Sequence, residues 1–310
     1  MSYSLNLLAA TVFLVSSPVE AVVTDNSSVT NNPSVAKSVV SEEGKKQRRD
    51  EALRLNELGL QQLNRGEYRE ALNHFEQALV IFREIGERKS EATILSNIGL
   101  VHRQLGEYPK ALDYYQQALA ITKQIGDKAR EGTTLNNIGL VYNALGKYTK
   151  ALNYYQQSLA ITKQIGNKAV EGTILNNISA VYSKLGEYAK ALDYYQQALA
   201  ILKKVGDKSR EGGVLINIGA VYVDLGEYAQ ALDYYQQALA IHKQISNKPL
   251  EGTTLLNIGN IYLTLEEYAK ALDYFQQALA IHKQVGNKAH EGVTLHNIGG
   301  VYNNLREYAK

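Results

Sequence analysis

Asparagine recurs along this chain at an interval of forty residues, each time in a closely similar local sequence. The recurring residues are Asn97, Asn137, Asn177, Asn217, Asn257 and Asn297. A carboxamide both donates and accepts hydrogen bonds, as a peptide backbone does. A row of such groups can hold an extended peptide whatever its sequence, and it can equally join neighbouring segments of the fold.

Residue patterns typical of enzymes and metal sites are missing from the sequence. Without cysteine there is no disulfide, thiolate metal site or cysteine nucleophile. His282, His290 and His296 cluster late in the chain, and His290–Glu291 begins like a zinc-protease helix, but position 294 is threonine where the second histidine is needed. No phosphate-binding glycine loop and no G-x-S-x-G occurs. We therefore expect no catalytic residue, no metal and no cofactor.

The charge balance favours a protein or peptide partner over a nucleic acid. The 310 residues include 33 basic and 31 acidic side chains, a net charge of +2, whereas nucleic-acid binders usually gather a basic excess on one face. Paired tyrosines such as Tyr114 and Tyr115 could stack on bases. Packing is the favoured interpretation, because one tyrosine of each pair falls on the predicted core stripe.

The asparagines belong to a larger repeat that predicts two helices in every forty residues. In residues 132–171, Leu135, Ile138 and Tyr142 follow helical spacing, and a second helical run begins at Ala151. Glycines 146 and 166 end the two helices, and Asn167, Asp127 and Asp207 are placed to cap the helices that follow. The repeats span 52–91, 92–131, 132–171, 172–211, 212–251 and 252–291, with a partial repeat at 292–310.

The residues at fixed positions of each repeat resemble the tetratricopeptide repeat signature over about residues 52–310. They are, in the third repeat, Leu135, Gly139, Tyr142, Gly146, Tyr148, Ala151, Tyr155 and Ser158. Departures are Gln62, Ser179, Glu266 and Arg306. The usual repeat has about 34 residues, so the longer period resembles that of kinesin light chain and LGN/Pins adaptors, and of exported bacterial, especially cyanobacterial, repeat proteins that often carry a CHAT peptidase domain. The resemblance implies an all-α, right-handed superhelical solenoid of antiparallel helix pairs.

The asparagines lie on the face of the first helix that points away from the core of their own repeat. At about 100° per residue, Asn137 shares this face with Thr133, Leu140 and Ala144. The resemblance implies that the face lines a concave, peptide-binding groove. The row of asparagines would hold the peptide backbone, and selectivity would come from Ile216, Val223, Leu256, Asn260 and Leu263.

Two interpretations of the asparagines stay open. The second-helix string DYYQQALAI scarcely changes between repeats, whereas Leu140 becomes Ala180, Ala220 and then Asn260. A fixed framework with a varied face favours ligand binding. Alternatively, each asparagine bonds to the first helix of the neighbouring repeat.

The N-terminus predicts export. Residues 5–15, LNLLAATVFLV, form a short apolar run, and Val19 and Ala21 suit cleavage after Ala21. We expect a signal peptide at 1–21, a flexible linker at 22–41 and a repeat solenoid at 42–310, with no stable membrane span in the mature chain. The protein would then be periplasmic or extracellular, and cytoplasmic if the N-terminal segment is not a signal.

The two ends of the repeat array differ. The first repeat carries Glu57 where the others carry asparagine, whereas Leu295, Ile298 and Val301 repeat the interior apolar pattern just before the sequence stops at REYAK. End repeats need water-tolerant outer faces. We expect the chain to be a fragment or the product of a truncated reading frame, or its C-terminal end to be covered by a partner or by self-association.

Three functions fit these patterns. The first is a non-catalytic scaffold that binds a protein or peptide in its groove. The second is the sensing arm of a larger enzyme, such as a CHAT-type peptidase, whose catalytic domain lies beyond Lys310. The third is a cytosolic peptide-pheromone or signalling receptor, which requires that the N-terminal segment is not a signal.

Overall fold

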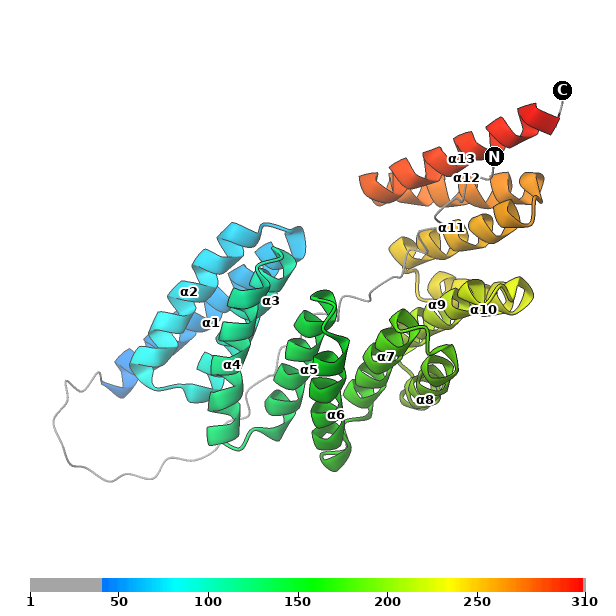
Figure 1. The fold of residues 1–310 in the computed structure, drawn as a ribbon. Helices are drawn as coiled ribbons and strands as arrows, with labels where there is room; N and C mark the ends of the chain where they lie inside the picture. Colours follow the sequence, from blue (N-terminus) through cyan, green and yellow to red (C-terminus); the bar gives the residue numbers. More distant parts are fainter. Residues whose placement is uncertain (1–40, 309–310) are drawn as a thin grey trace. The chain divides into compact units, whose positions relative to one another are not determined.

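The computed structural model describes residues 41–308, which consist of helices joined by short turns, with no strand in this range. Figure 1 shows the thirteen helices in chain order. They are α1 (Glu42–Arg65), α2 (Tyr68–Ile85), α3 (Arg88–Gln104), α4 (Tyr108–Gln124), α5 (Lys128–Ala144), α6 (Tyr148–Gln164), α7 (Lys168–Lys184), α8 (Tyr188–Val205), α9 (Lys208–Asp224), α10 (Tyr228–Gln244), α11 (Lys248–Thr264), α12 (Tyr268–Gln284) and α13 (Lys288–Tyr308).

The expected signal peptide at 1–21 and all but the last residue of the expected linker lie outside the described residues. Among the helices between residues 41 and 308, none is both long and apolar enough to cross a membrane.

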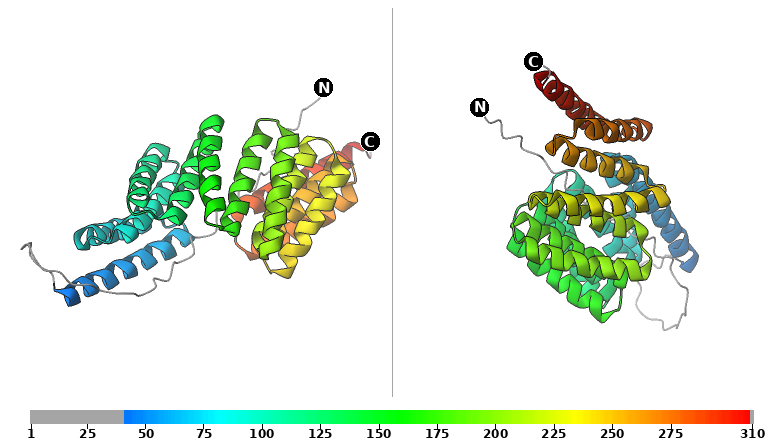
Figure 2. Two further views of the ribbon diagram at one scale, coloured as in Figure 1. Left: turned by 90° about the horizontal axis from the view of Figure 1, so that it is seen from below. Right: turned by 90° about the vertical axis from the view of Figure 1, so that its right-hand side faces the viewer.

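The helices form two compact units, here called the N-terminal unit (α1–α6, up to Val170) and the C-terminal unit (from Glu171 in α7 to α13). Within each unit consecutive helices run antiparallel and lie side by side, as Figures 1 and 2 show. Odd-numbered helices are the first helices of the repeats and even-numbered helices are the second. The all-α fold of antiparallel helix pairs predicted from the sequence is confirmed.

Local sequence sets where the helices begin and end. The predicted terminators Gly146 and Gly166 adopt left-handed φ angles of 69° and 72°. At the next helix starts, Asp127 Oδ1 accepts a hydrogen bond from the Arg130 amide at 3.0 Å, and Asn167 Oδ1 accepts one from the Val170 amide at 3.2 Å. Asp207 caps α9 in the same way, accepting from the Arg210 amide at 3.0 Å. These predictions are confirmed.

Two turns carry a side chain where the other repeats carry glycine, and this predicts a way to stabilise the protein. Glu266 and Ser246 have φ angles of 59° and 55°. A left-handed conformation costs a residue with a Cβ about 1 kcal/mol more than glycine. We expect Ser246→Gly to raise the free energy of unfolding of the C-terminal unit by about 1 kcal/mol, measured by urea unfolding.

The matched control is Gly226→Ala. Gly226 has a φ of 76°, and a Cβ there would meet no atom within 4 Å, so its effect reports backbone conformation alone. It should lower stability by a similar amount. A Ser246→Gly protein no more stable than the wild type would contradict the prediction.

The core is built where an aromatic ring of the second helix packs on a glycine of the first. A Cβ added to Gly139 would lie 2.5 Å from Tyr155 Cε1, and one added to Gly259 would lie 2.6 Å from Phe275 Cδ1. Tyr155 and Phe275 are fully buried. The other aromatic of each pair stacks on a first-helix ring, as Tyr154 does on Tyr142 with centroids 5.3 Å apart. Both tyrosines of a pair are therefore used in packing.

A second close contact is made near the end of each second helix of the C-terminal unit, where a side chain packs on a glycine of the first helix. In the C-terminal unit, Leu202 packs on Gly172, His242 on Gly212 and His282 on Gly252. All three side chains have an exposed fraction of 0%. The same structural position thus holds leucine in one repeat and histidine in the next two.

The last helix has an open face. Val293 and Leu295 of α13 are 50% and 47% exposed, whereas Thr253 and Leu255 at the same positions of α11 are 5% and 1% exposed. Self-association through this face stays a prediction.

Candidate functional site

Three of the recurring asparagines bond to the first helix of the preceding repeat. Asn97 Nδ2 of α3 donates to Asn56 Oδ1 of α1 at 2.9 Å, and Asn217 Nδ2 of α9 donates to Asn176 Oδ1 of α7 at 2.9 Å. Asn97 and Asn217 are both only 4% exposed. In α13, Asn297 Nδ2 donates to Asn260 Oδ1 of α11 at 2.7 Å. In these places the carboxamides join consecutive first helices.

The acceptors Asn56 and Asn176 occupy one repeat position, here called the acceptor position, which other repeats fill differently. It holds Ser96, Ile216 and Leu256 in the second, fifth and sixth repeats. Ile216 and Leu256 are each 1% exposed. Ile216 lies in one apolar cluster with Ile258 of α11, and Leu256 lies in another with Val301 of α13. Both residues therefore pack between first helices. Because a ligand cannot touch their side chains, they could affect ligand selectivity only indirectly.

Asn257 differs from Asn97 and Asn217 because its acceptor position holds Ile216, which cannot accept a hydrogen bond. Asn257 is 7% exposed. Within residues 41–308 its side chain makes no hydrogen bond to a neighbouring helix, and the same is true of the half-buried Asn137. Asn177 is also half-buried. Asn257 thus has little exposed surface, and its carboxamide bonds to no neighbouring helix within the described residues.

The other expected selectivity residues stay partly accessible. Val223 of α9 and Asn260 and Leu263 of α11 are half-buried. Asn257, Asn260 and Leu263 share α11, and Val223 lies on the preceding first helix. Together they place polar and apolar groups on the first helices of the C-terminal unit.

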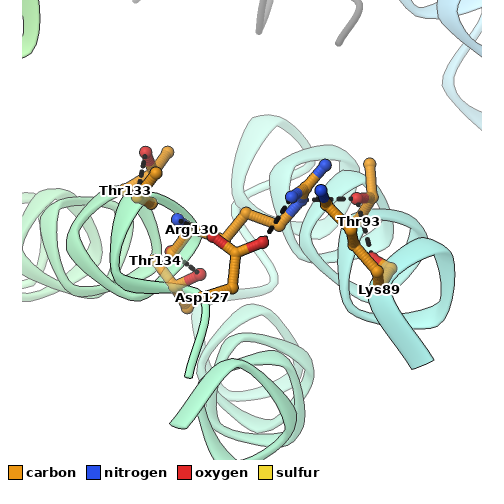
Figure 3. Close-up of polar contacts among 7 residues, drawn as sticks. Lys89, Thr93, Asp127, Arg130, Thr133 and Thr134 are labelled. Atoms are coloured by element: carbon orange, nitrogen blue, oxygen red, sulfur yellow. Dashed lines mark hydrogen bonds and ion pairs between the residues drawn. The ribbon is translucent and has the colours of Figure 1, made fainter. Parts of the chain in front are cut away.

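An arginine bridge joins first helices in the N-terminal unit and was not anticipated from the sequence. Arg130 Nε of α5 donates to Thr93 Oγ1 of α3 at 3.0 Å, and its Nη1 lies 2.5 Å from Asp127 Oδ2 (Figure 3). Burial raises the pKa of Asp127, but the hydrogen bonds and positive charge of Arg130 outweigh it and hold that pKa below its usual value. The only sequence signal is an arginine three residues after the capping aspartate, at 130 and again at 210.

The late histidines do not gather into one cluster. The rings of His282 and His290 lie 5.1 Å apart and are tilted, while His296 is exposed on α13. In the described part of the chain, no three His, Cys, Asp or Glu residues are placed to share a metal ion.

The helix pairs, with glycine against aromatic ring in successive repeats, match a known family. A model of the tetratricopeptide repeat matches residues 50–124, 130–204, 211–284 and 252–310. The chain belongs to the tetratricopeptide repeat family. The Asn97–Asn56 and Asn217–Asn176 bonds are thus contacts between successive tetratricopeptide repeats.

Solved structures share the tetratricopeptide fold at low sequence identity. A Rap protein complexed with Competence and Sporulation Factor is 15% identical, with a TM-score of 0.62, over 86% of this chain and 79% of that one. BtubC from P. vanneervenii is 20% identical, with a TM-score of 0.58, over 78% of this chain and 92% of that one.

A signal-transduction ATPase with a tetratricopeptide repeat sensor, from Pyrococcus horikoshii, is also 20% identical, with a TM-score of 0.58. The match covers 86% of this chain but 41% of that protein. No curated protein sequence matches this chain significantly. Identities this low show the fold alone, and the tetratricopeptide fold is consistent with a protein-binding scaffold.

Proposed function

We propose that this chain is a non-catalytic scaffold that binds a peptide or protein segment on the first-helix face of its C-terminal unit. The observation that carries the proposal is Asn257, whose carboxamide has no partner on α9 because Ile216 fills the acceptor position. The amide atoms of Asn257 are not among the fully buried ones that lack a partner, so a ligand can reach them. A bound peptide backbone would supply a donor and an acceptor for this carboxamide.

The neighbouring residues suit such a ligand. Asn260 and Leu263 lie on the same helix and Val223 on the preceding first helix, all partly accessible. Amides would hold the backbone and the apolar residues would select side chains. The Rap structure, which holds a bound factor, supports ligand binding by a chain of this fold.

The test compares Asn257→Ala with the wild type, using peptides selected on the wild type from a random-peptide display library. Loss of two backbone hydrogen bonds, each worth about 0.5–1.5 kcal/mol, should weaken binding about tenfold. The unfolding midpoint should stay the same, because Asn257 bonds to no neighbouring helix.

Two matched variants separate binding from folding. Asn217→Ala removes the bond to Asn176 and should lower stability by about 1 kcal/mol. Gln237→Ala on the exposed face of α10 removes only a bond to Asp233 and should change neither property. Selected peptides that bind Asn257→Ala as tightly as the wild type would contradict the proposed site.

A second candidate is that the repeats form the sensing arm of a larger protein. The ATPase from P. horikoshii, in which a chain of this fold is a sensor, favours it. A CHAT-type peptidase is the specific form we propose. Sequencing the intact transcript tests it: a peptidase domain in the same reading frame would support this function, and a stop codon directly after Lys310 would exclude it.

A further inference from the structure

A cavity of about 340 Å³ opens between α4, α5 and α6 of the N-terminal unit. Its apolar lining comes from Leu119 of α4 and Leu135 of α5, and its aromatic lining from the stacked pair Tyr142 and Tyr154. This volume lies at the lower end of the range for small-molecule sites. The cavity is separate from the α9 and α11 residues used in the proposed function.

The charged residues that line the cavity are both lysines. Lys123 reaches it from α4 and Lys150 from α6, and no aspartate or glutamate contributes to the lining. The Lys150 ammonium lies 5.5 Å from the centre of the Tyr142 ring. Among residues 41–308, neither lysine has a carboxylate within ion-pair distance. The two positive charges therefore face the cavity without neutralising partners.

The other repeats show why Lys150 has no carboxylate partner. At the same position, Lys110 pairs with Glu107 at 3.0 Å, Lys270 pairs with Glu267 at 2.5 Å, and Lys190 pairs with Glu187. The glutamate of those pairs is replaced by Lys147 in this repeat. A carboxylate that neutralises the lysine elsewhere is thus replaced here by a further positive charge.

A second carboxylate is missing, and this one would belong to the cavity lining itself. Asn153 stands where other repeats carry Asp113, Asp193, Asp233 and Asp273. The oxygen of Asn153 accepts a hydrogen bond from Gln157 Nε2 at 2.6 Å, which leaves its own NH₂ group to donate. The polar groups contributed by Lys123, Lys150 and Asn153 are therefore donors, in a place where sister repeats present acceptors.

We propose that this cavity binds a small organic anion. Its carboxylate or phosphate group would be held by Lys123, Lys150 and the Asn153 amide, because charge-assisted hydrogen bonds to anions are the strong ones. Its apolar or aromatic body would lie against Leu119, Leu135 and the Tyr154 ring. The Glu→Lys and Asp→Asn replacements together distinguish this repeat from the other repeats of the chain.

The test measures binding of phenyl phosphate and benzoate to the full chain by calorimetry, with phenol as the neutral probe. We expect saturable binding of at least one anion, at least tenfold tighter than phenol. Amide NMR shifts should concentrate in α4–α6. Failure of both anions to bind at about 10 mM, a concentration well above the Kd of even a weak specific site, would overturn the proposal. Phenol binding as tight as that of the anions would also overturn the proposal.

Sister repeats supply variants that should fold. Lys147→Glu with Asn153→Asp restores the residues of the other repeats and should weaken anion binding at least tenfold without moving the unfolding midpoint. Unchanged affinity would overturn the proposal.

The converse variant is Glu267→Lys with Asp273→Asn. The equivalents of the lining residues between α10, α11 and α12 are then identical to those of the site: Leu239, Lys243, Leu255, Tyr262, Lys270, Tyr274 and Gln277. The stoichiometry should rise from one anion to two. A stoichiometry that stays at one would overturn the proposal that these two replacements create the anion site.

Discussion

Replacing Phe275 by alanine should lower the free energy of unfolding of the C-terminal unit by about 3–5 kcal/mol. Phe275 has an exposed fraction of 0% and lies in one apolar cluster with Leu255, Leu256 and Val301. Its ring also covers Gly259, which has no side chain that could move into the space left behind. The cavity would therefore stay open, and large cavities carry the largest costs.

Amide hydrogen exchange is the suitable measurement, because long repeat arrays need not unfold in one step. Protection should fall most in α11 and α12. The control is Phe275→Tyr, since Tyr115, Tyr155, Tyr195 and Tyr235 fill this position in other repeats, and it should lower stability much less than Phe275→Ala does. A Phe275→Ala protein with the protection of Phe275→Tyr would contradict the prediction.

Acidification from pH 6.5 to pH 4 should destabilise the same unit through His242, by up to about 3 kcal/mol. Burial lowers the pKa of His242 to about 4, against a smaller opposing effect of the Glu251 charge. Neither ring nitrogen has a hydrogen-bond partner among the described residues. The unfolded chain binds a proton near pH 6.5, so the stability contribution is complete above that pH and is lost as the pH falls towards 4.

The measurement is the urea unfolding free energy at a series of pH values for the wild type and His242→Leu. Leucine is a natural occupant of this position, because Leu202 packs on Gly172 as His242 packs on Gly212. The variant should lose most of the slope between pH 6.5 and 4. Burial also lowers the pKa of His282, with a further contribution from the charge of His290, so a smaller slope should remain. Identical slopes would show that His242 does not cause the acid sensitivity.

Helix positions followed from the sequence because capping acts between residues only a few positions apart. Asp127 meets the Arg130 amide and Gly146 ends α5 through contacts within one turn. The repeat also identified Tyr155 as a core residue, since an aromatic residue recurs at this position on the apolar stripe of every second helix. Periodicity alone was enough for these features.

The neighbours of the asparagine row did not follow from the sequence. The spacing showed that Asn217 points away from its own core, but a helical wheel does not show what it points towards. Asn217 meets Asn176, which is 41 residues away, because the register between consecutive first helices is set by packing. The same register buries Ile216, which the sequence placed beside the groove.

By itself, then, the sequence determined the helices, their ends, the family and the residues that face each repeat's own core, because all of these depend on local spacing. Only the tertiary structure decided which asparagines bond to a neighbouring first helix and which, such as Asn257, do not. It alone also brought Lys123 of α4 beside Lys150 and Asn153 of α6 at one cavity. The physical reason is that contacts between repeats depend on how helices pack, and residues far apart in the chain acquire a shared environment only through that packing.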